Sequence, residues 1–300
     1  MHLFLSKYMN YRARSLTLFI SIVVLCCTTM YGLAMHWHTT RSPQRMTVTM
    51  LDIGQGDALY VRFGDGSDML IDASPDRSVL TELAEVMPWW DRTIDTLILT
   101  HPDSDHIAGA HAVMQQYTIG RIFDCGLRDK HTETVKRVYD DIREQDISLQ
   151  SVYAGDQFDI PSGEQIHILS PKALVPQSEK DSNSCSLVFT ISDQNATVLF
   201  TGDAPAEIEE QLVTRDSTIL DVDVLKVAHH GSNTSSVQSF LDAVTPSIAL
   251  ISVGEHNSYH HPHPSVISRL KKTGAQIFST VDDGRVRCVS TGEMFECRGE

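Results

Sequence analysis

Residues Thr100–His101–Pro102–Asp103–Ser104–Asp105–His106 form a stretch in which four side chains can bind a metal. The stretch follows the apolar run Leu97–Leu99, which predicts a strand. Because alternate side chains of an extended segment point the same way, His101, Asp103 and Asp105 can converge. His106 can reach the same point from the start of the next helix. Neighbouring carboxylates repel one another, and a divalent cation removes that cost. The stretch therefore predicts a metal site, since a solvated acidic loop would leave both histidines unexplained.

Further acidic residues and histidines follow other apolar runs. Asp72 comes directly after Met69–Ile71, and Asp203 follows Leu199–Gly202. His229–His230 follow the run Val224–Ala228. Each of these alone could be an ordinary turn residue. Because groups at strand ends gather at one edge of a layered α/β protein, we expect them to lie near the first stretch.

The apolar pattern after residue 45 alternates strands and helices in two halves. It predicts strands over 46–53, 58–63, 69–71, 96–100, 121–124, 149–153, 165–169, 186–192, 196–200, 222–227, 248–253 and 276–279. It predicts helices over 78–87, 107–117, 132–144, 205–214, 235–244 and 264–272. Two such halves indicate an α/β protein with two sheets packed face to face and helices outside.

These motifs together resemble those of metallo-β-lactamase-fold hydrolases, and in particular the nuclease-like domain of ComEC-type DNA-uptake competence proteins. The first stretch is similar to the fold's His-x-His-x-Asp-His signature, with Asp103 in place of the second histidine, a variant typical of the ComEC-type group. The other matching segments are Met50–Ala58, Leu70–Asp72, Leu199–Asp203, Leu225–Ser232 and His261–Pro264. The resemblance covers about residues 46 to 290.

The resemblance implies a four-layer αββα sandwich with a two-metal site at one edge. His101 and Asp103 would bind one ion. Asp105, His106 and a histidine of the 229–230 pair, with His229 favoured over His230, would bind the other. Asp203 would bridge the ions, and Asp72 would orient the ligand loop from outside. The fold's usual third-motif histidine has no clear counterpart, and the polar segment 181–186 stands in its place. An oxygen-rich site favours Zn²⁺ or Mn²⁺.

Two adjacent cations can generate hydroxide near neutral pH and stabilise the oxygens of a phosphodiester during hydrolysis. Asp105 counts among the catalytic candidates for this reason. The candidates for contacting the phosphate or protonating the leaving group are Lys226, Ser232, His261 and His263. The histidines of the last motif could equally belong to an exposed loop. Asp52 and Asp57 flank a Gly-rich turn, where they either face the substrate or serve as turn residues.

Three functions fit the pattern. The first is an enzyme, a metal-dependent phosphodiesterase that acts on nucleic acid. The second is a phosphoesterase that acts on a small or cell-envelope substrate such as a phosphocholine ester. The net charge of −15 favours this second function, because nucleic-acid binding relies on cationic side chains. The third is a non-catalytic module that binds nucleic acid or a protein partner, against which the intact ligand set argues.

The amino terminus differs from the rest of the chain. Lys7, Arg12 and Arg14 precede the uncharged run Leu16–Met35, which at about 20 residues is long enough to span a bilayer as a helix. The basic flank would stay in the cytoplasm and place the remainder outside. We therefore expect a membrane or signal segment over 1–35, a linker over 36–45 and one catalytic domain over 46–300. A cleaved signal peptide, which would give a secreted protein, and a buried core helix are the alternatives.

Four cysteines lie in the predicted domain. The turn Gly292–Glu293 would place Cys288 opposite Cys297 in a hairpin, where a disulfide is possible and two small apolar neighbours are the alternative. A disulfide would fit an oxidising compartment. Cys125 and Cys185 are expected to be buried apolar residues rather than reactive thiols.

Overall fold

The computed structural model describes residues 20–32, 45–128, 132–173 and 182–300. The chain divides into two units, residues 1–44 and 45–300. In the first unit the described part is a helix over residues 20–32. Of the helices in the described ranges, none is both long and apolar enough to cross a membrane. Most of the predicted membrane segment and linker lie outside the described residues.

The larger unit contains an eight-stranded sheet with the order β15-β14-β1-β2-β3-β4-β5-β6. Its strands are β1 (Thr47–Met50), β2 (Leu59–Arg62), β3 (Asp68–Ile71), β4 (Thr93–Leu99), β5 (Thr118–Asp124), β6 (Ser148–Ser151), β14 (Val286–Ser290) and β15 (Phe295–Gly299). Pairing is antiparallel from β15 to β3 and parallel from β3 to β6. The parallel strands are the ones that helical connections join, as parallel neighbours require.

The second sheet has seven strands in the order β13-β12-β11-β10-β9-β8-β7. They are β7 (Gln157–Asp159), β8 (Gln165–Ser170), β9 (Val188–Asp193), β10 (Ala196–Phe200), β11 (Val224–Lys226), β12 (Ile248–Ile251) and β13 (Gln276–Ser279). Strands β10 to β13 are parallel, and β7 to β10 are antiparallel. Each sheet therefore has a parallel part whose strands all end at one edge.

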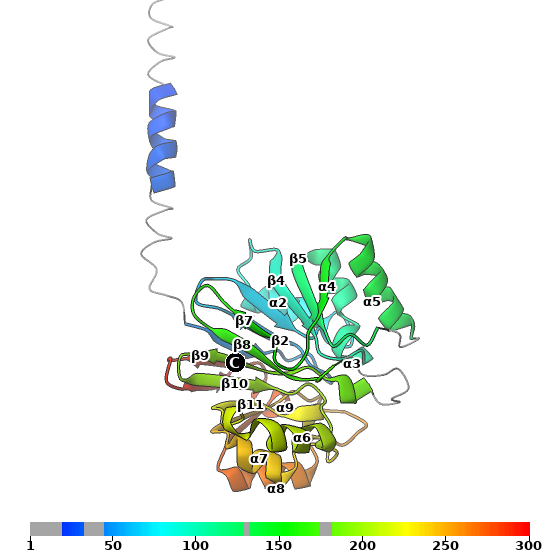
Figure 1. Cartoon of the computed structure of the whole chain (residues 1–300). Coiled ribbons are helices and arrows are strands. Elements are labelled where there is room, and N and C mark those ends of the chain that lie inside the picture. The colour runs from blue at the N-terminus through cyan, green and yellow to red at the C-terminus, as the bar shows by residue number, and fades with distance from the viewer. Residues whose placement is uncertain (1–19, 33–44, 129–131, 174–181) are drawn as a thin grey trace, which may run out of the picture. The chain divides into compact units, whose positions relative to one another are not determined.

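Helices cover the outer face of each sheet (Figure 1). On the first sheet these are α2 (Ser78–Val86), α3 (Ser104–Ile107), α4 (Ala110–Gln116) and α5 (Glu133–Glu144). On the second they are α6 (Ala206–Asp216), α7 (Gln238–Val244) and α8 (Pro264–Thr273), while α9 (Thr280–Asp283) follows β13. One apolar core lies between the sheets, and a further core lies under each helical layer. The predicted two-sheet α/β sandwich is thus confirmed.

Two details show how local sequence sets the geometry. The helix predicted over 107–117 is divided into α3 and α4 at Gly109, where a side chain would collide with the Ala73 carbonyl oxygen. At the carboxyl end, β14 and β15 form the predicted hairpin, and Thr291 N donates to Met294 O across its turn. Cys288 pairs with Cys297 in the predicted register, and the two residues form a disulfide.

Candidate metal centre

Asp72 fixes the loop that carries the main ligand stretch. It follows β3 with a left-handed backbone (φ 56°) and is fully buried. One carboxylate oxygen accepts from Thr100 N at 2.8 Å, and the other accepts from Thr100 Oγ1 at 2.7 Å. The second oxygen also contacts His106 Nδ1 at 2.7 Å. Asp72 therefore lies where the resemblance placed it, behind the loop, and it holds the end of β4 and the start of α3 against β3.

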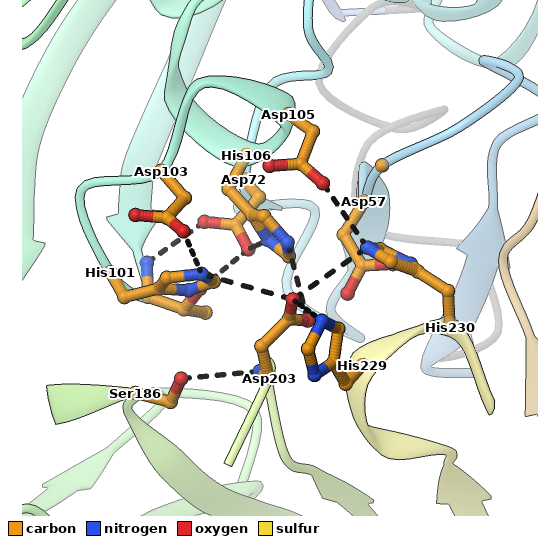
Figure 2. A network of polar contacts seen from close by, with 12 residues as sticks. Asp57, Asp72, His101, Asp103, Asp105, His106, Ser186, Asp203, His229 and His230 are labelled. Atoms are coloured by element: carbon orange, nitrogen blue, oxygen red, sulfur yellow. Dashed lines mark hydrogen bonds and ion pairs between the residues drawn. The ribbon is translucent and has the colours of Figure 1, made fainter. Parts of the chain in front are cut away.

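These bonds determine which imidazole nitrogens are free to bind a cation (Figure 2). Because an ionised Asp72 only accepts, His106 Nδ1 donates to it, and Nε2 is the nitrogen left to bind a cation. The Thr100 hydroxyl donates to Asp72, so it accepts from His101 Nδ1 at 3.0 Å. His101 Nε2 is then unprotonated. Both rings are buried and present their free nitrogen to the same region.

Asp203 lies at the centre of the cluster, directly after β10 and Gly202. Its backbone amide donates to Ser186 Oγ at 3.2 Å. Its Oδ1 is 3.2 Å from His106 Nε2, and its Oδ2 is 3.9 Å from His101 Nε2. The same Oδ2 lies 3.7 Å and 3.8 Å from Nε2 of the two histidines that follow β11. The carboxylate thus faces imidazoles from two separate segments, the one after β4 and the one after β11, as Figure 2 shows.

The structure separates the two histidines of η3 (Ala228–Gly231), which both have positive φ angles. His230 is buried, and its Nδ1 donates to the Ser252 carbonyl oxygen at 3.0 Å. Its Nε2 is therefore free and lies 3.5 Å from Asp105 Oδ2. His229 is 28% exposed and contacts Thr234 Oγ1 through Nδ1. The structure thus brings both histidines to Asp203, although the sequence favoured His229, and His230 is the one that also faces Asp105.

Ligand atoms of Asp105, His106, Asp203 and His230 all lie within 4.8 Å of one another. The buried atoms His101 Nε2, His106 Nε2, His230 Nε2 and Asp203 Oδ1 have no hydrogen-bond partner among the described residues. Leaving such atoms unpaired inside a protein is costly. Imidazole nitrogens and carboxylate oxygens are the donors that zinc and manganese bind. The residues present therefore fit divalent cations.

The electrostatics without a cation point the same way. Burial opposes ionisation of Asp203, but the imidazoles of His106 and His230 outweigh it and hold its pKa well below the usual range. Burial likewise opposes charge on His230, but Asp203 and Asp57 raise its pKa to about 9. Burial raises and the imidazoles lower the pKa of Asp105, which ends at about 2. Without a cation, His106 and His230 therefore hold protons that a bound cation would displace.

Asp103 and the segment before β9 contact the cluster next to His101. Asp103 Oδ2 is 4.0 Å from His101 Nε2, and its other oxygen accepts from Ser182 Oγ. Ser182 belongs to η1 (Ser182–Cys185), within the polar run that the sequence has where the third-motif histidine was expected. With Ser186 on the Asp203 amide, this segment supports two of the acidic residues through hydroxyls. The polar run 181–186 was the only sequence signal for these contacts.

Lys226 does not take the predicted place beside a substrate. Its side chain is 1% exposed, and Nζ donates to Asp57 Oδ2 at 2.7 Å and to the Val227 carbonyl at 3.1 Å. Asp57 is equally buried, and its other oxygen is 3.4 Å from His230 Nδ1. The prediction of a catalytic Lys226 is therefore wrong, because its ammonium is enclosed in an ion pair. Asp57 instead lies behind the histidine that faces Asp105.

The remaining predicted residues fall in different places. His261 borders the centre, with its ring centroid 5.7 Å from that of His229. His263 caps α8, and its Nδ1 accepts from Ser265 N, which accounts for this histidine without catalysis. Ser232 is buried and bonds Thr234 rather than facing an open site. Asp52 is exposed, and its amide donates to Glu82, so it is not part of the cluster.

Comparison with known proteins agrees with this geometry. The family model described as "Metallo-beta-lactamase superfamily" matches residues 51–256. ComE operon protein 3 of Bacillus subtilis is 30% identical over 91% of this chain and 36% of its own length. Competence protein ComA of Neisseria gonorrhoeae is 31% identical over 78% of this chain and 30% of its own. The chain thus spans about a third of these relatives, and the resemblance to ComEC-type competence proteins is confirmed.

A solved structure shows the same fold. CmlA, a diiron beta-hydroxylase from Streptomyces venezuelae, superposes with a TM-score of 0.51 at 13% identity, covering 79% of this chain and 53% of its own. By the family match, which extends over most of the sandwich, the chain belongs to the metallo-beta-lactamase superfamily, whose members are in general metal-dependent hydrolases.

Proposed function

We propose that the chain is an extracytoplasmic hydrolase that binds two divalent cations, Zn²⁺ or Mn²⁺, and cleaves phosphodiester bonds of nucleic acid. One observation carries this proposal. Buried, unpaired nitrogens of His101, His106 and His230 surround the Asp203 carboxylate. A bound cation would displace the protons of such imidazoles and satisfy these nitrogens together with the Asp203 carboxylate.

The residues divide into two sets around Asp203. Its Oδ2 faces His101, which lies beside Asp103, and its Oδ1 faces His106, which lies beside Asp105. A carboxylate with its oxygens turned to different imidazoles is suited to bridge two ions. When bound, adjacent cations stabilise charge on phosphoryl oxygens and make water an effective nucleophile at neutral pH. Asp72 and Ser182 keep the ligands in place through the hydrogen bonds described above.

We propose His261 as a residue that contacts the substrate. It borders His229 at the partly exposed side of the centre. Burial, together with the nearby imidazole of His229, lowers its pKa to about 4. At neutral pH His261 is therefore uncharged, so it can donate a hydrogen bond to a phosphate oxygen but has no extra proton for a leaving group. Of the two roles expected for His261, contact with the phosphate is therefore the one that we propose.

Observations outside the metal centre support the proposed substrate and the proposed location of the protein. A relative named as a competence protein favours nucleic acid. The net charge of −15 opposes binding of a polyanion away from the cations, so affinity would depend on the metal centre. The Cys288–Cys297 disulfide and the uncharged run Leu16–Met35 favour export and anchoring at the membrane.

The test is cleavage of single- and double-stranded DNA by the purified chain with added Mn²⁺ or Zn²⁺. Cleavage should require metal and disappear in the double variant Asp103→Ala/Asp203→Ala. The matched control is Asp242→Ala, which removes an exposed carboxylate from α7 and should keep full activity. Activity that survives in the double variant would refute the proposal.

The acidic charge supports a second candidate, a phosphoesterase for a small or cell-envelope substrate such as a phosphocholine ester. Hydrolysis of a chromogenic phosphodiester without cleavage of DNA would select it over the nuclease. Metal binding without turnover of either substrate would instead identify a binding module for nucleic acid or a partner.

A further inference from the structure

We propose that Cys125 and Cys185 form a second disulfide, which joins the two sheets beside the candidate metal centre. Cys125 directly follows β5 in the eight-stranded sheet. Cys185 ends η1, three residues before β9 of the seven-stranded sheet starts at Val188. Both residues are buried in the core between the sheets. From the sequence both were expected to be buried apolar residues rather than reactive thiols, and 60 positions separate them along the chain.

The distance between the two sulfur atoms is the first argument. Cys125 Sγ and Cys185 Sγ are 2.7 Å apart, which is closer than unbonded sulfur atoms pack. The bonded distance is about 2.05 Å, so closure requires a shift of well under one ångström. Their exposed fractions are 2% and 0%, so neither thiol can turn away into solvent. The backbone therefore already holds these side chains in a position to bond.

The second argument is chemical. The chain already carries one disulfide, between Cys288 and Cys297, so a compartment where that bond forms also oxidises other paired thiols. Cys125 and Cys185 would together lose two protons and two electrons as the S–S bond forms. A disulfide oxidant such as glutathione disulfide takes up the electrons and protons and becomes two thiols.

The environment also determines when the bond forms. Contact with Cys125, together with burial, raises the pKa of the Cys185 thiol. Since the thiolate is the attacking species, exchange is slow once the sheets have closed. The bond would therefore form during folding, while oxidant can still reach both thiols.

The proposed bond would also support two candidate ligands of the metal centre, because of where Cys185 lies. Cys185 lies between Ser182, which donates to Asp103, and Ser186, which accepts from the Asp203 amide. A covalent bond at Cys185 would anchor this segment to the opposite sheet. The existence of the bond does not depend on the proposed hydrolase function, and only its effect on the ligands does.

The test uses the full chain, denatured with reductant and refolded in a mixture of glutathione and glutathione disulfide. Free thiols are then alkylated in denaturant, and the unreduced protein is digested and mapped by mass spectrometry. We expect a peptide pair joining Cys125 to Cys185 in most molecules. Linked Cys288–Cys297 in the same sample shows that oxidation was sufficient. Alkylated Cys125 and Cys185 in molecules with that linkage would overturn the proposal.

A second measurement uses the background Cys288→Ser/Cys297→Ser, which leaves the proposed bond as the one disulfide of residues 45–300. Unfolding this variant in reductant and refolding it with reductant present should lower its melting temperature by several degrees relative to the oxidised, refolded variant, because the cross-link restricts the unfolded chain. Adding Cys125→Ala and Cys185→Ala should abolish the effect of reductant. A melting temperature that reductant leaves unchanged in the first background would contradict the proposal.

Discussion

Replacing Lys226 by methionine tests whether the buried ion pair supports the centre. The lysine ammonium and the Asp57 carboxylate are 2.7 Å apart, with side chains 1% and 2% exposed. Methionine fills most of the space but leaves the carboxylate buried without its cation. Breaking a buried pair in this way costs about 3–5 kcal/mol. That is a large part of the roughly 5–15 kcal/mol that holds a domain folded.

The assay is urea unfolding of the chain with chelator present, so that metal binding does not contribute. Burial raises the pKa of Asp57, but Lys226 and then His230 outweigh it and lower the pKa overall. In the native chain this carboxylate therefore stabilises the fold above the unfolded-state pKa of about 3.8, and the stabilisation is lost as pH falls. Without Lys226 the buried carboxylate can take a proton, so the cost of the substitution should shrink from pH 7 to pH 4.

The double variant Asp57→Asn/Lys226→Met is the matched control, since it removes both charges. It should recover a substantial part of the lost free energy, because no buried charge is left alone. A cost below about 1 kcal/mol for Lys226→Met, as for an exposed pair, together with a raised KM for substrate, would refute the assignment. That result would instead support the original prediction that Lys226 contacts the substrate.

Four further outcomes are expected. Asp72→Ala should weaken metal affinity about 10- to 100-fold, because it removes the group that orients His106; unchanged affinity by calorimetry would contradict this. His261→Ala should lower kcat/KM about 10-fold or more with metal content unchanged, as loss of a hydrogen bond to a charged oxygen predicts. His263→Ala should instead cost about 1 kcal/mol in urea unfolding, by loss of the α8 cap, and leave kcat intact. Because the folded-state pKa of His230 is raised to about 9, the metal-free chain should lose stability as pH rises from 6.5 to 9, and loading with metal should remove this dependence.

The position of the centre could be predicted because its residues follow apolar runs. Asp72, His101 and Asp203 each follow a strand of a parallel pair, with no more than two residues between them and the strand end. Parallel strands end at the same edge of a sheet, so the sequence pattern alone predicts that these residues lie close together at that edge. The division into two sheets followed in the same way from the alternation of strands and helices.

The roles of single side chains could not be predicted, because contacts from distant segments determine them. His229 and His230 are adjacent and both have left-handed backbones. The carbonyl of Ser252, which lies beyond the next helix and strand, accepts from His230 Nδ1 and so orients Nε2 of this ring towards Asp105. Lys226 follows apolar residues in a buried strand, but only the pairing with Asp57, 169 positions earlier, shows that its charge is enclosed. The Cys125–Cys185 contact likewise joins two sheets.

The most direct test of the central claim is a crystal structure of the chain grown with Mn²⁺ or Zn²⁺, with anomalous diffraction used to locate the ions. The arrangement predicts two anomalous peaks on either side of the Asp203 carboxylate. One should lie within bonding distance of His101 Nε2, and the other within bonding distance of His106 Nε2 and His230 Nε2. Crystals soaked in excess metal that show no ion at these nitrogens would contradict the account.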